Sequence, residues 1–185
     1  MSSLQIRPLN IADYEAWLPL ARGYKSFYKT AVSADELAAA WQRLHNKTIP
    51  TYGLGAFDEG RLVGITHYLL HCGCWTVKSY CYLQDLYVDE SARGKGVARA
   101  LIKAVYTAAP QQGADRVYWM THETNEAAMR LYDTVAERSG FLLYRKMLAK
   151  RSALHDATTE LKNKASSIKS SQSKTLGGRN ISSLI

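Results

Sequence analysis

Residues 82–105 read YLQDLYVDESARGKGVARALIKAV, a stretch in which a strand, a short loop and a helix follow one another. Tyrosine, leucine and valine dominate residues 79–89 and predict a strand, whereas the apolar residues of 96–109 recur at helical spacing. The loop between them contains two cations and two glycines, Arg93, Gly94, Lys95 and Gly96. This composition predicts a binding site for a negatively charged group, because the first turn of a helix has unpartnered N–H groups and a partial positive charge.

Two familiar phosphate-binding patterns do not fit this loop. A Walker loop needs a lysine and then serine or threonine after its second glycine, but Val97 follows Gly96. A dinucleotide fingerprint needs a third small residue where Arg99 stands. The pattern that fits is Arg93-x-x-Gly96-x-Ala98, in which glycine lets the backbone approach a pyrophosphate and Ala98 leaves the helix face open. A solvated glycine turn without a ligand is the alternative that the loop alone leaves open.

The chain up to residue 148 predicts a mixed sheet with helices on both faces. Strands are predicted at 4–8, 52–70, 79–89, 116–121 and 141–148, and the second range folds back as a hairpin at DEGR, residues 58–61. Helices are predicted at 11–28 with an interruption near Pro19, at 33–44 with a capping box of Ser33 and Glu36, at 96–109 and at 125–140. Strands paired as hairpins and then alternating with helices are typical of an α/β (α+β) fold.

Residues 150–185 differ in composition from the rest of the chain. They hold seven Lys or Arg residues against two Asp or Glu residues and no aromatic residue, whereas residues 1–149 hold 17 against 14. The net charge of +8 therefore resides mostly in this basic, Ser/Lys-rich tail, which we expect to be helical or disordered. Residues 1–149 are expected to form one domain without a strong basic stripe, so no nucleic-acid partner is expected.

Other sequence features indicate an intracellular protein. The N-terminus, MSSLQIRPLN, has no apolar run typical of a signal peptide, and no segment approaches the roughly 20 apolar residues of a membrane span. We expect no membrane association and a cytoplasmic location, with the nucleus left open. The three cysteines, Cys72, Cys74 and Cys81, are an odd number at spacings unsuited to zinc. They predict reduced, packed thiols and no metal site.

Two segments match the signatures of one protein family. LQDLYVDESARGKGVARALI (83–102) fits a strand, a turn and a helix start of the form [RQ]-x-x-G-x-[GA], through Arg93, Gly96 and Ala98. THETNEAAMRLYDTVAERSGF (121–141) fits a second signature, in which an asparagine precedes a helix with A-x-x-x-Y that ends near G-F. Together they resemble the GNAT superfamily of acetyl-CoA-dependent N-acetyltransferases. The resemblance implies that family's mixed, mostly antiparallel central sheet, flanked by helices on both faces and splayed at the acetyl-CoA site.

The resemblance also implies how acetyl-CoA would be held. The pantetheine arm would pair with the backbone of Leu86, Tyr87 and Val88 in the manner of an added strand. The pyrophosphate would lie on the amides of the loop and the helix start, namely Arg93, Gly94, Lys95, Gly96, Val97 and Ala98. Asn125 matches a position that contacts the cosubstrate arm, and it is equally suited to cap the helix that follows.

The catalytic residues are implied only in part. Tyr132 matches the tyrosine that protonates the departing CoA thiolate, and an ordinary core tyrosine is its alternative reading. Some relatives carry a glutamate that acts as the general base where this chain has Gln84, whose amide cannot usefully accept a proton. We retain Asp85 as the catalytic candidate, although strand alternation puts it on the face opposite Gln84. Glu123, His122 or an ordered water chain remain alternatives for the base.

The implied reaction is transfer of the acetyl group of acetyl-CoA to the primary amine of a small molecule, such as an amino acid or a polyamine, by direct attack. Candidates for lining the acceptor site are aromatic and histidine side chains: Tyr24, Phe27, Tyr28, His67, His71 and Trp119. Two alternatives stay open, acetylation of a protein or histone lysine and a non-catalytic acyl-CoA-binding role. Homodimers are frequent in the family, so a homodimer is the assembly that the resemblance suggests.

Overall fold

The computed structural model describes residues 4–148 and divides the chain into two units, Met1–Arg138 and Ser139–Ile185. Every helix and strand of the described residues belongs to the first unit. The described part of the second unit, residues 139–148, contains neither, so the strand predicted at 141–148 is wrong. That segment has the composition of a strand, but a strand also needs neighbouring backbone groups to pair with. The tail predicted at 150–185 lies outside the described residues.

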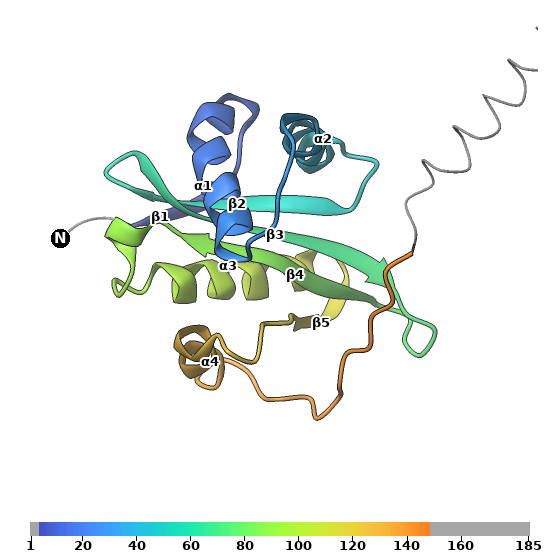
Figure 1. The fold of residues 1–185 in the computed structure, drawn as a ribbon. Coiled ribbons are helices and arrows are strands. Elements are labelled where there is room, and N and C mark those ends of the chain that lie inside the picture. The colour runs from blue at the N-terminus through green and yellow to red at the C-terminus, as the bar shows by residue number, and fades with distance from the viewer. Residues whose placement is uncertain (1–3, 149–185) are drawn as a thin grey trace, which may run out of the picture. The chain divides into compact units, whose positions relative to one another are not determined.

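Five strands form one sheet in the order β1-β2-β3-β4-β5 (Figure 1). They are β1 (Gln5–Pro8), β2 (Thr51–Asp58), β3 (Arg61–Cys72), β4 (Ser79–Val88) and β5 (Ala114–Tyr118). Neighbouring strands pair antiparallel from β1 to β4, whereas β4 and β5 run parallel. The predicted mixed and mostly antiparallel sheet is therefore confirmed. The strand predicted at 116–121 begins two residues earlier and leaves the sheet after Tyr118.

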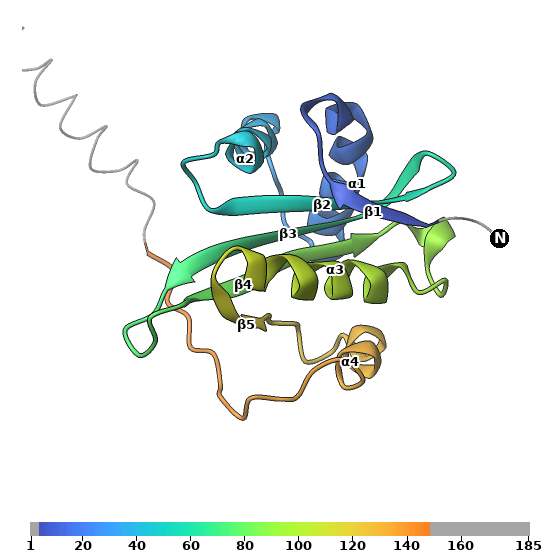
Figure 2. The same cartoon turned by 180° about the vertical axis from the view of Figure 1, so that it is seen from behind.

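Helices cover both faces of the sheet, as predicted (Figure 1, Figure 2). They are α1 (Tyr14–Phe27), α2 (Ala34–His45), α3 (Val97–Gln111) and α4 (Glu126–Tyr132). α1 and α2 pack on one face through a core that includes Trp17, Trp41 and Ile65. α3 packs on the opposite face through a core that includes Leu101 and Val105. Side chains on β4 therefore meet α1 on one face and α3 on the other.

Two helices differ from their predicted course. α1 continues through Pro19, because the buried face that includes Trp17 offsets the one backbone hydrogen bond that proline removes. α4 ends at Tyr132 rather than near residue 140. Beyond it the hydroxyl of Thr134 donates to the carbonyl of Leu131 at 2.6 Å, a local bond that competes with helix continuation. None of the helices within residues 4–148 is long and apolar enough to cross a bilayer.

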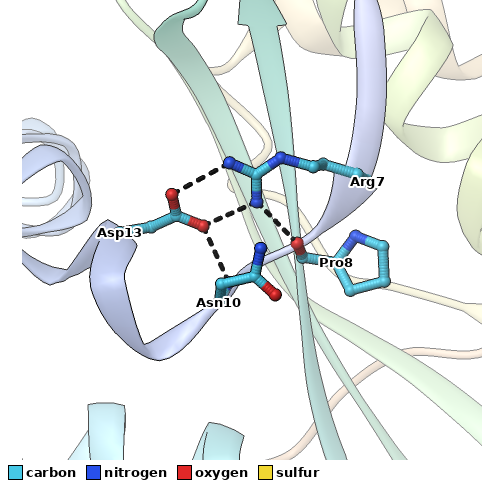
Figure 3. Close-up of polar contacts among 4 residues, drawn as sticks. All are labelled: Arg7, Pro8, Asn10 and Asp13. Atoms are coloured by element: carbon cyan, nitrogen blue, oxygen red, sulfur yellow. Dashed lines mark hydrogen bonds and ion pairs between the residues drawn. The ribbon is translucent and has the colours of Figure 1, made fainter.

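A bidentate ion pair fixes the start of α1 to β1 (Figure 3). Arg7 donates from its two terminal nitrogens to Asp13 at 2.7 and 2.9 Å, and from one of them to the carbonyl of Pro8 at 3.0 Å. Asp13 also accepts from the backbone N–H of Asn10 at 2.7 Å. The hydrogen bonds from Arg7 hold the pKa of Asp13 below its usual value, against the opposing effect of burial. This clamp sets where α1 begins on the sheet.

α1 approaches β4 closely at Gly23. A Cβ at this position would lie 2.5 Å from the hydroxyl oxygen of Tyr87, so a larger residue would have to displace the end of the Tyr87 side chain. The next two residues of α1, Tyr24 and Lys25, therefore lie close to β4. The Tyr24 hydroxyl lies 3.3 Å from the backbone carbonyl of Gln84 on that strand.

The cysteines were predicted to be packed, and only one of them is. Cys81 is buried in the α3-side core. Cys72 and Cys74 are exposed, because Cys72 is the last residue of β3 and Cys74 lies in the loop beyond it. The prediction of packed thiols is therefore wrong for these two, since cysteine type alone does not reveal where a strand ends.

Candidate active site

The glycine loop joins β4 to α3 through a short 3-10 turn, Glu90–Ala92. Asp89 caps this turn by accepting from the backbone N–H of Ser91 at 3.0 Å. Gly94 and Gly96 have φ angles of 77° and 80°, in the left-handed region, and Gly96 is the N-cap of α3. A Cβ on either glycine would meet no atom within 4 Å. The backbone conformation requires these glycines, and the space beside the helix start is open.

This open helix start fits a pyrophosphate. The first amides of α3, from Val97 on, have no acceptor inside the helix, because helical bonding begins at the carbonyl of Gly96. Lys95 and Arg93 are exposed beside them. Arg93 is held at the end of β4, where its Nε donates to the carbonyl of Val88 at 3.3 Å. The residues predicted to hold an anion are thus gathered in one place, and their role stays a prediction.

β4 and β5 pair along only part of β4 (Figure 2). The parallel ladder joins Ser79–Tyr82 to β5, whereas on its other side β4 pairs with β3 as far as Val88. From Leu83 onward, the backbone groups that point away from β3 have no partner strand within the part of the chain that the structure describes. Leu86, Tyr87 and Val88 lie on this free edge. An extended ligand can pair with such an edge, as predicted for the pantetheine arm.

A β-bulge in β4 decides which way Asp85 faces. His67 on β3 pairs with Asp85, but the next residue, Tyr68, pairs with Leu83, so Gln84 is an extra residue. Strict alternation would put Leu83 and Asp85 on the same face. Because of the bulge, Leu83 packs in the α3-side core while Asp85 reaches His67 on the α1 side. The alternation that counted against Asp85 is therefore interrupted here, and Gln84 is exposed.

Asp85 is a buried carboxylate in a chain of polar contacts. It is 9% exposed, and its Oδ2 lies 2.9 Å from Nδ1 of His67, whose Nε2 lies 2.8 Å from Nε1 of Trp17. Burial raises the pKa of Asp85, but the interactions with His67, Lys25 and Tyr24 outweigh burial and leave this pKa below its usual value. Asp85 is therefore ionised at neutral pH.

Two tyrosines, Tyr24 and Tyr82, interact with this carboxylate, and Tyr28 lies beside Tyr24, with ring centroids 5.2 Å apart. Tyr24 and Tyr28 come from the end of α1, Tyr82 from β4 and Tyr132 from α4. Burial, together with the phenol of Tyr28, raises the pKa of Tyr24, of Tyr82 and of Tyr132, the last to about 12. Asp85 also raises the pKa of Tyr24 and of Tyr82. Tyr28 acts on the other three, so it links Tyr132 electrostatically to the two tyrosines beside Asp85.

Asn125 and the two residues proposed as alternative bases lie at the start of α4. The Asn125 side chain accepts from the N–H of Ala128 at 3.4 Å and donates to the hydroxyl of Thr121 at 3.3 Å, so it caps the helix. Its contact with the cosubstrate stays a prediction. His122 and Glu123 are exposed on the preceding loop. Within residues 4–148, neither forms a hydrogen bond with the buried carboxylate or the tyrosines around it.

The other residues predicted to line the acceptor site are placed unequally. Trp119 packs edge-on against Tyr132, with ring centroids 5.3 Å apart, and its place in the acceptor site stays a prediction. Phe27 lies at the end of α1 and is 55% exposed. His71 bonds through Nε2 to the hydroxyl of Tyr118 at 2.9 Å, at a point on β3 four residues beyond His67. Tyr118 also packs against Tyr82, with ring centroids 5.1 Å apart, so His71 belongs to a group of rings that adjoins the tyrosines beside Asp85.

Three residues of this neighbourhood were not predicted: Trp17, Lys25 and Tyr82. Trp17 bonds to a histidine 50 residues away, and its helical spacing marks it only as a core residue. Tyr82 reads as ordinary strand composition. No local pattern marks these residues, because only the folded chain brings them together.

The sequence is similar to those of known proteins. The sequence model of the Acetyltransferase (GNAT) family matches residues 14–136. The D-amino-acid N-acetyltransferase HPA3 of Saccharomyces cerevisiae is 37% identical over 143 residues, which cover 76% of this chain and 89% of HPA3. The thialysine N-epsilon-acetyltransferase of Caenorhabditis elegans is 32% identical over 92 residues, which cover 50% of this chain and 56% of that protein.

A solved structure shows the same fold. The aminoglycoside N-acetyltransferase AAC(6')-Iy, in complex with CoA, superimposes with a TM-score of 0.70 over 80% of this chain and 97% of that chain. The two sequences are 18% identical, so this likeness concerns the fold.

Proposed function

Because the chain belongs to the GNAT acetyltransferase family, we propose that it transfers the acetyl group of acetyl-CoA to the primary amine of a small molecule. One observation carries the proposal: the ionised carboxylate of Asp85 lies at the bulge of β4, where the free edge suited to an extended cosubstrate begins, while the phenol of Tyr132 on α4 stays protonated. The carboxylate suits an incoming ammonium and the phenol suits a departing thiolate. A reaction that joins an amine to a thioester carbonyl needs both kinds of group.

Asp85 binds the acceptor amine and does not store its proton. An amine of ordinary pKa, about 10.4, and a carboxyl of about 3.9 differ by about 6.5 pH units, or about 9 kcal/mol, and the lowered pKa of Asp85 widens the gap. A proton therefore does not remain on this carboxylate. Asp85 orients the ammonium, whose proton passes to water before the nitrogen attacks the thioester.

Tyr132 acts at the other end of the reaction. As the C–N bond forms and the C–S bond breaks, the bonding electrons go to the CoA sulfur, the nitrogen releases its second proton to water, and the departed thiolate takes a proton from water. Burial and the nearby Tyr28 raise the pKa of Tyr132 to about 12, so its phenol stays protonated at neutral pH. It donates a hydrogen bond to the sulfur as negative charge develops there. The free edge of β4 and the loop before α3 hold the cosubstrate in place for this step.

Lys25 favours an amino acid among small amines. Its charge acts on Asp85, and its ammonium nitrogen lies 5.4 Å from the centroid of the Tyr24 ring. An amino acid presents an amine to Asp85 and a carboxylate to Lys25, whereas a polyamine would meet repulsion from Lys25. The likeness to HPA3, which is named as a D-amino-acid N-acetyltransferase, supports the same class of acceptor.

Release of CoA thiol from acetyl-CoA tests the proposal, scanned over D- and L-amino acids, polyamines, aminoglycosides and histone-tail peptides. We expect turnover on amino acids. Asp85→Asn should raise the KM of the amine about 10-fold or more, because a hydrogen-bonded charge contributes about 1.5–3 kcal/mol. Asp115→Asn on β5, a partly exposed carboxylate paired with Arg116, is the matched control and should leave that KM unchanged.

Two results of that scan would contradict the proposal. Turnover on histone-tail peptides alone would indicate a protein acetyltransferase. Tight binding of acetyl-CoA without turnover on any amine would indicate a non-catalytic acyl-CoA-binding protein. We also keep two earlier predictions, a catalytic domain at residues 1–149 and a homodimer. Analytical ultracentrifugation measures the oligomeric state directly.

A further inference from the structure

Three residues from three elements form a hydrogen-bonded chain that ends at the acceptor site. The indole of Trp17 on α1 lies 2.8 Å from His67 on β3, and His67 lies 2.9 Å from Asp85 on β4. Trp17 is 1% exposed, and the side chains of His67 and Asp85 are each 12% exposed. The chain is therefore shielded from water along most of its length.

The chemistry of the indole assigns the proton on His67. An indole N–H only donates, so Nε2 of His67 must be the acceptor in its contact with Trp17. Nε2 therefore carries no proton, and the single ring proton of a neutral imidazole sits on Nδ1. From Nδ1 it is donated to Oδ2 of Asp85. The tautomer follows from the donor-only partner, since the other tautomer would place two N–H groups face to face.

A second proton on His67 would disrupt this chain. It would have to bind Nε2, which faces the indole N–H, so the contact with Trp17 would be lost. The indole N–H would then be left without a partner in the core, which is unfavourable for a buried donor. The chain also offers no exit for a proton, because an indole cannot accept one. His67 is thus unsuited to relay a proton away from Asp85.

We propose that Trp17 is a positioning residue that keeps His67 neutral and thereby fixes the charge of the His67–Asp85 pair at minus one while a cationic acceptor binds. This inference rests on the proposed function in one respect, that the ligand of Asp85 is an amine. The carboxylate of Asp85 by itself favours a proton on His67, and the indole N–H of Trp17 opposes that proton. An imidazolium at His67 would make the pair neutral and would weaken the attraction of Asp85 for an ammonium. Trp17 acts through His67 and makes no contact with the substrate itself.

The other groups that face Asp85 do not provide such a switch. Besides His67 on β3, they are Lys25 and Tyr24 on α1 and Tyr82 on β4. Burial raises the pKa of Tyr24 and of Tyr82, so both stay neutral. Among these residue types, only histidine ordinarily changes its charge between pH 5 and 8. A pH effect on acceptor binding in that range therefore reports on His67.

The kinetic test compares the KM of the acceptor in Trp17→Phe with that of the wild type between pH 8 and pH 5.5. The KM of the variant divided by that of the wild type should rise about 10-fold or more as the pH falls, because His67 gains a proton that Trp17 no longer opposes. The KM of acetyl-CoA should not follow this rise. The double variant Trp17→Phe/His67→Gln should return the ratio to a constant value, because glutamine does not titrate. Trp41→Phe, which alters another buried tryptophan of the same core, should show no rise.

A pH-independent ratio in Trp17→Phe would overturn the proposal, since a purely structural tryptophan lowers activity equally at every pH. A rise that persists in the double variant would also overturn it, because the effect would not pass through His67. If Trp17→Phe does not fold, His67→Gln takes its place. It should retain the shape of the wild-type pH profile, and a changed shape would show that His67 titrates in the native protein.

A spectroscopic test does not depend on activity. With ¹⁵N-labelled histidine in the full chain, free of substrates, the His67 signals should show a protonated Nδ1 and an unprotonated Nε2 at pH 6, and His67→Gln assigns them. A protonated Nε2 would refute the positioning role even if the protein proves to be an amine acetyltransferase. The expected tautomer in a protein that acetylates no amine would instead refute the proposed function and leave the assignment of the proton intact.

Discussion

Replacing Tyr132 by phenylalanine removes one oxygen atom from the active site and keeps the ring. Tyr132 is the last residue of α4, and its ring packs edge-on against Trp119 with centroids 5.3 Å apart. That contact survives in Tyr132→Phe, so the fold should be retained. The substitution therefore isolates what the phenol does for the departing thiolate.

The raised pKa limits how large this effect can be. Burial, with the nearby Tyr28, raises the pKa of Tyr132 to about 12, whereas a thiol has an ordinary pKa of about 8.5. Complete proton transfer from phenol to thiolate is uphill by about 3.5 pH units, or about 4.8 kcal/mol. Tyr132 therefore contributes a hydrogen bond to developing charge, about 1.5–3 kcal/mol. We expect Tyr132→Phe to lower kcat by between about 10-fold and about 150-fold.

Steady-state release of CoA thiol at saturating amino acid and acetyl-CoA measures this loss. Tyr52→Phe is the matched control. It makes the same substitution on β2, two strands from β4, in a ring stacked on Tyr68, and should keep the wild-type kcat. A loss above about 10⁴-fold would refute the reasoning, because it exceeds the range for one hydrogen bond and would mean obligatory proton transfer. An alkaline limb below pH 9 that disappears in Tyr132→Phe would refute the raised pKa.

Three further results are expected. Gly96→Ala should destabilise the fold by about 1–2 kcal/mol, because alanine is strained at a φ of 80°, and should raise the KM of acetyl-CoA more than that of the amine. Gly23→Ala should lower the free energy of unfolding by about 1–3 kcal/mol, since its Cβ would lie 2.5 Å from the hydroxyl oxygen of Tyr87. The hydrogen bonds from Arg7 lower the pKa of Asp13, so this ion pair stabilises the fold above the ordinary carboxyl pKa of about 3.9, and its contribution is lost as the pH falls through the folded-state pKa. Asp13→Asn should accordingly lower the urea midpoint at pH 7 and have little effect at pH 2.

Controls for these variants lie elsewhere in the fold. Gly60→Ala has a similar φ, 79°, and equally open surroundings in the β2–β3 turn, so it should cost similar stability without changing the KM of acetyl-CoA. An equal rise in that KM for both glycine variants would show that the loop before α3 has no special part in binding. A urea midpoint for Asp13→Asn that differs from the wild type equally at pH 7 and pH 2 would contradict the ionic origin of its effect.

Local composition was sufficient for most of the fold. The strand predicted at 79–89 and the helix predicted at 96–109 correspond to β4 and α3, and Ser33 begins α2 by accepting from the N–H of Glu36 at 3.2 Å. These features depend on residues a few positions apart. The strand predicted at 141–148 had equally suitable residues, but strand pairing depends on a neighbour that the segment itself does not contain.

The site was accessible from the sequence only where its parts are contiguous. The loop at 93–98 and the asparagine cap of α4 are local features, and the structure places both at helix starts. No residue in the run Leu83-Gln84-Asp85 signals a bulge, so the direction of Asp85 required the register with β3. The contact between Trp17 and His67 required the packing of α1 on the sheet.

The partial pairing of β4 with β5 also affects how readily this protein aggregates at high concentration. From Leu83 to Val88, β4 offers an open edge within the described residues, and such an edge accepts any extended backbone, including that of a neighbouring molecule. A cosubstrate arm lying along the edge closes it. The bound cosubstrate would then protect the sheet against edge-to-edge pairing, so protein stored with CoA should aggregate more slowly than protein from which CoA has been removed.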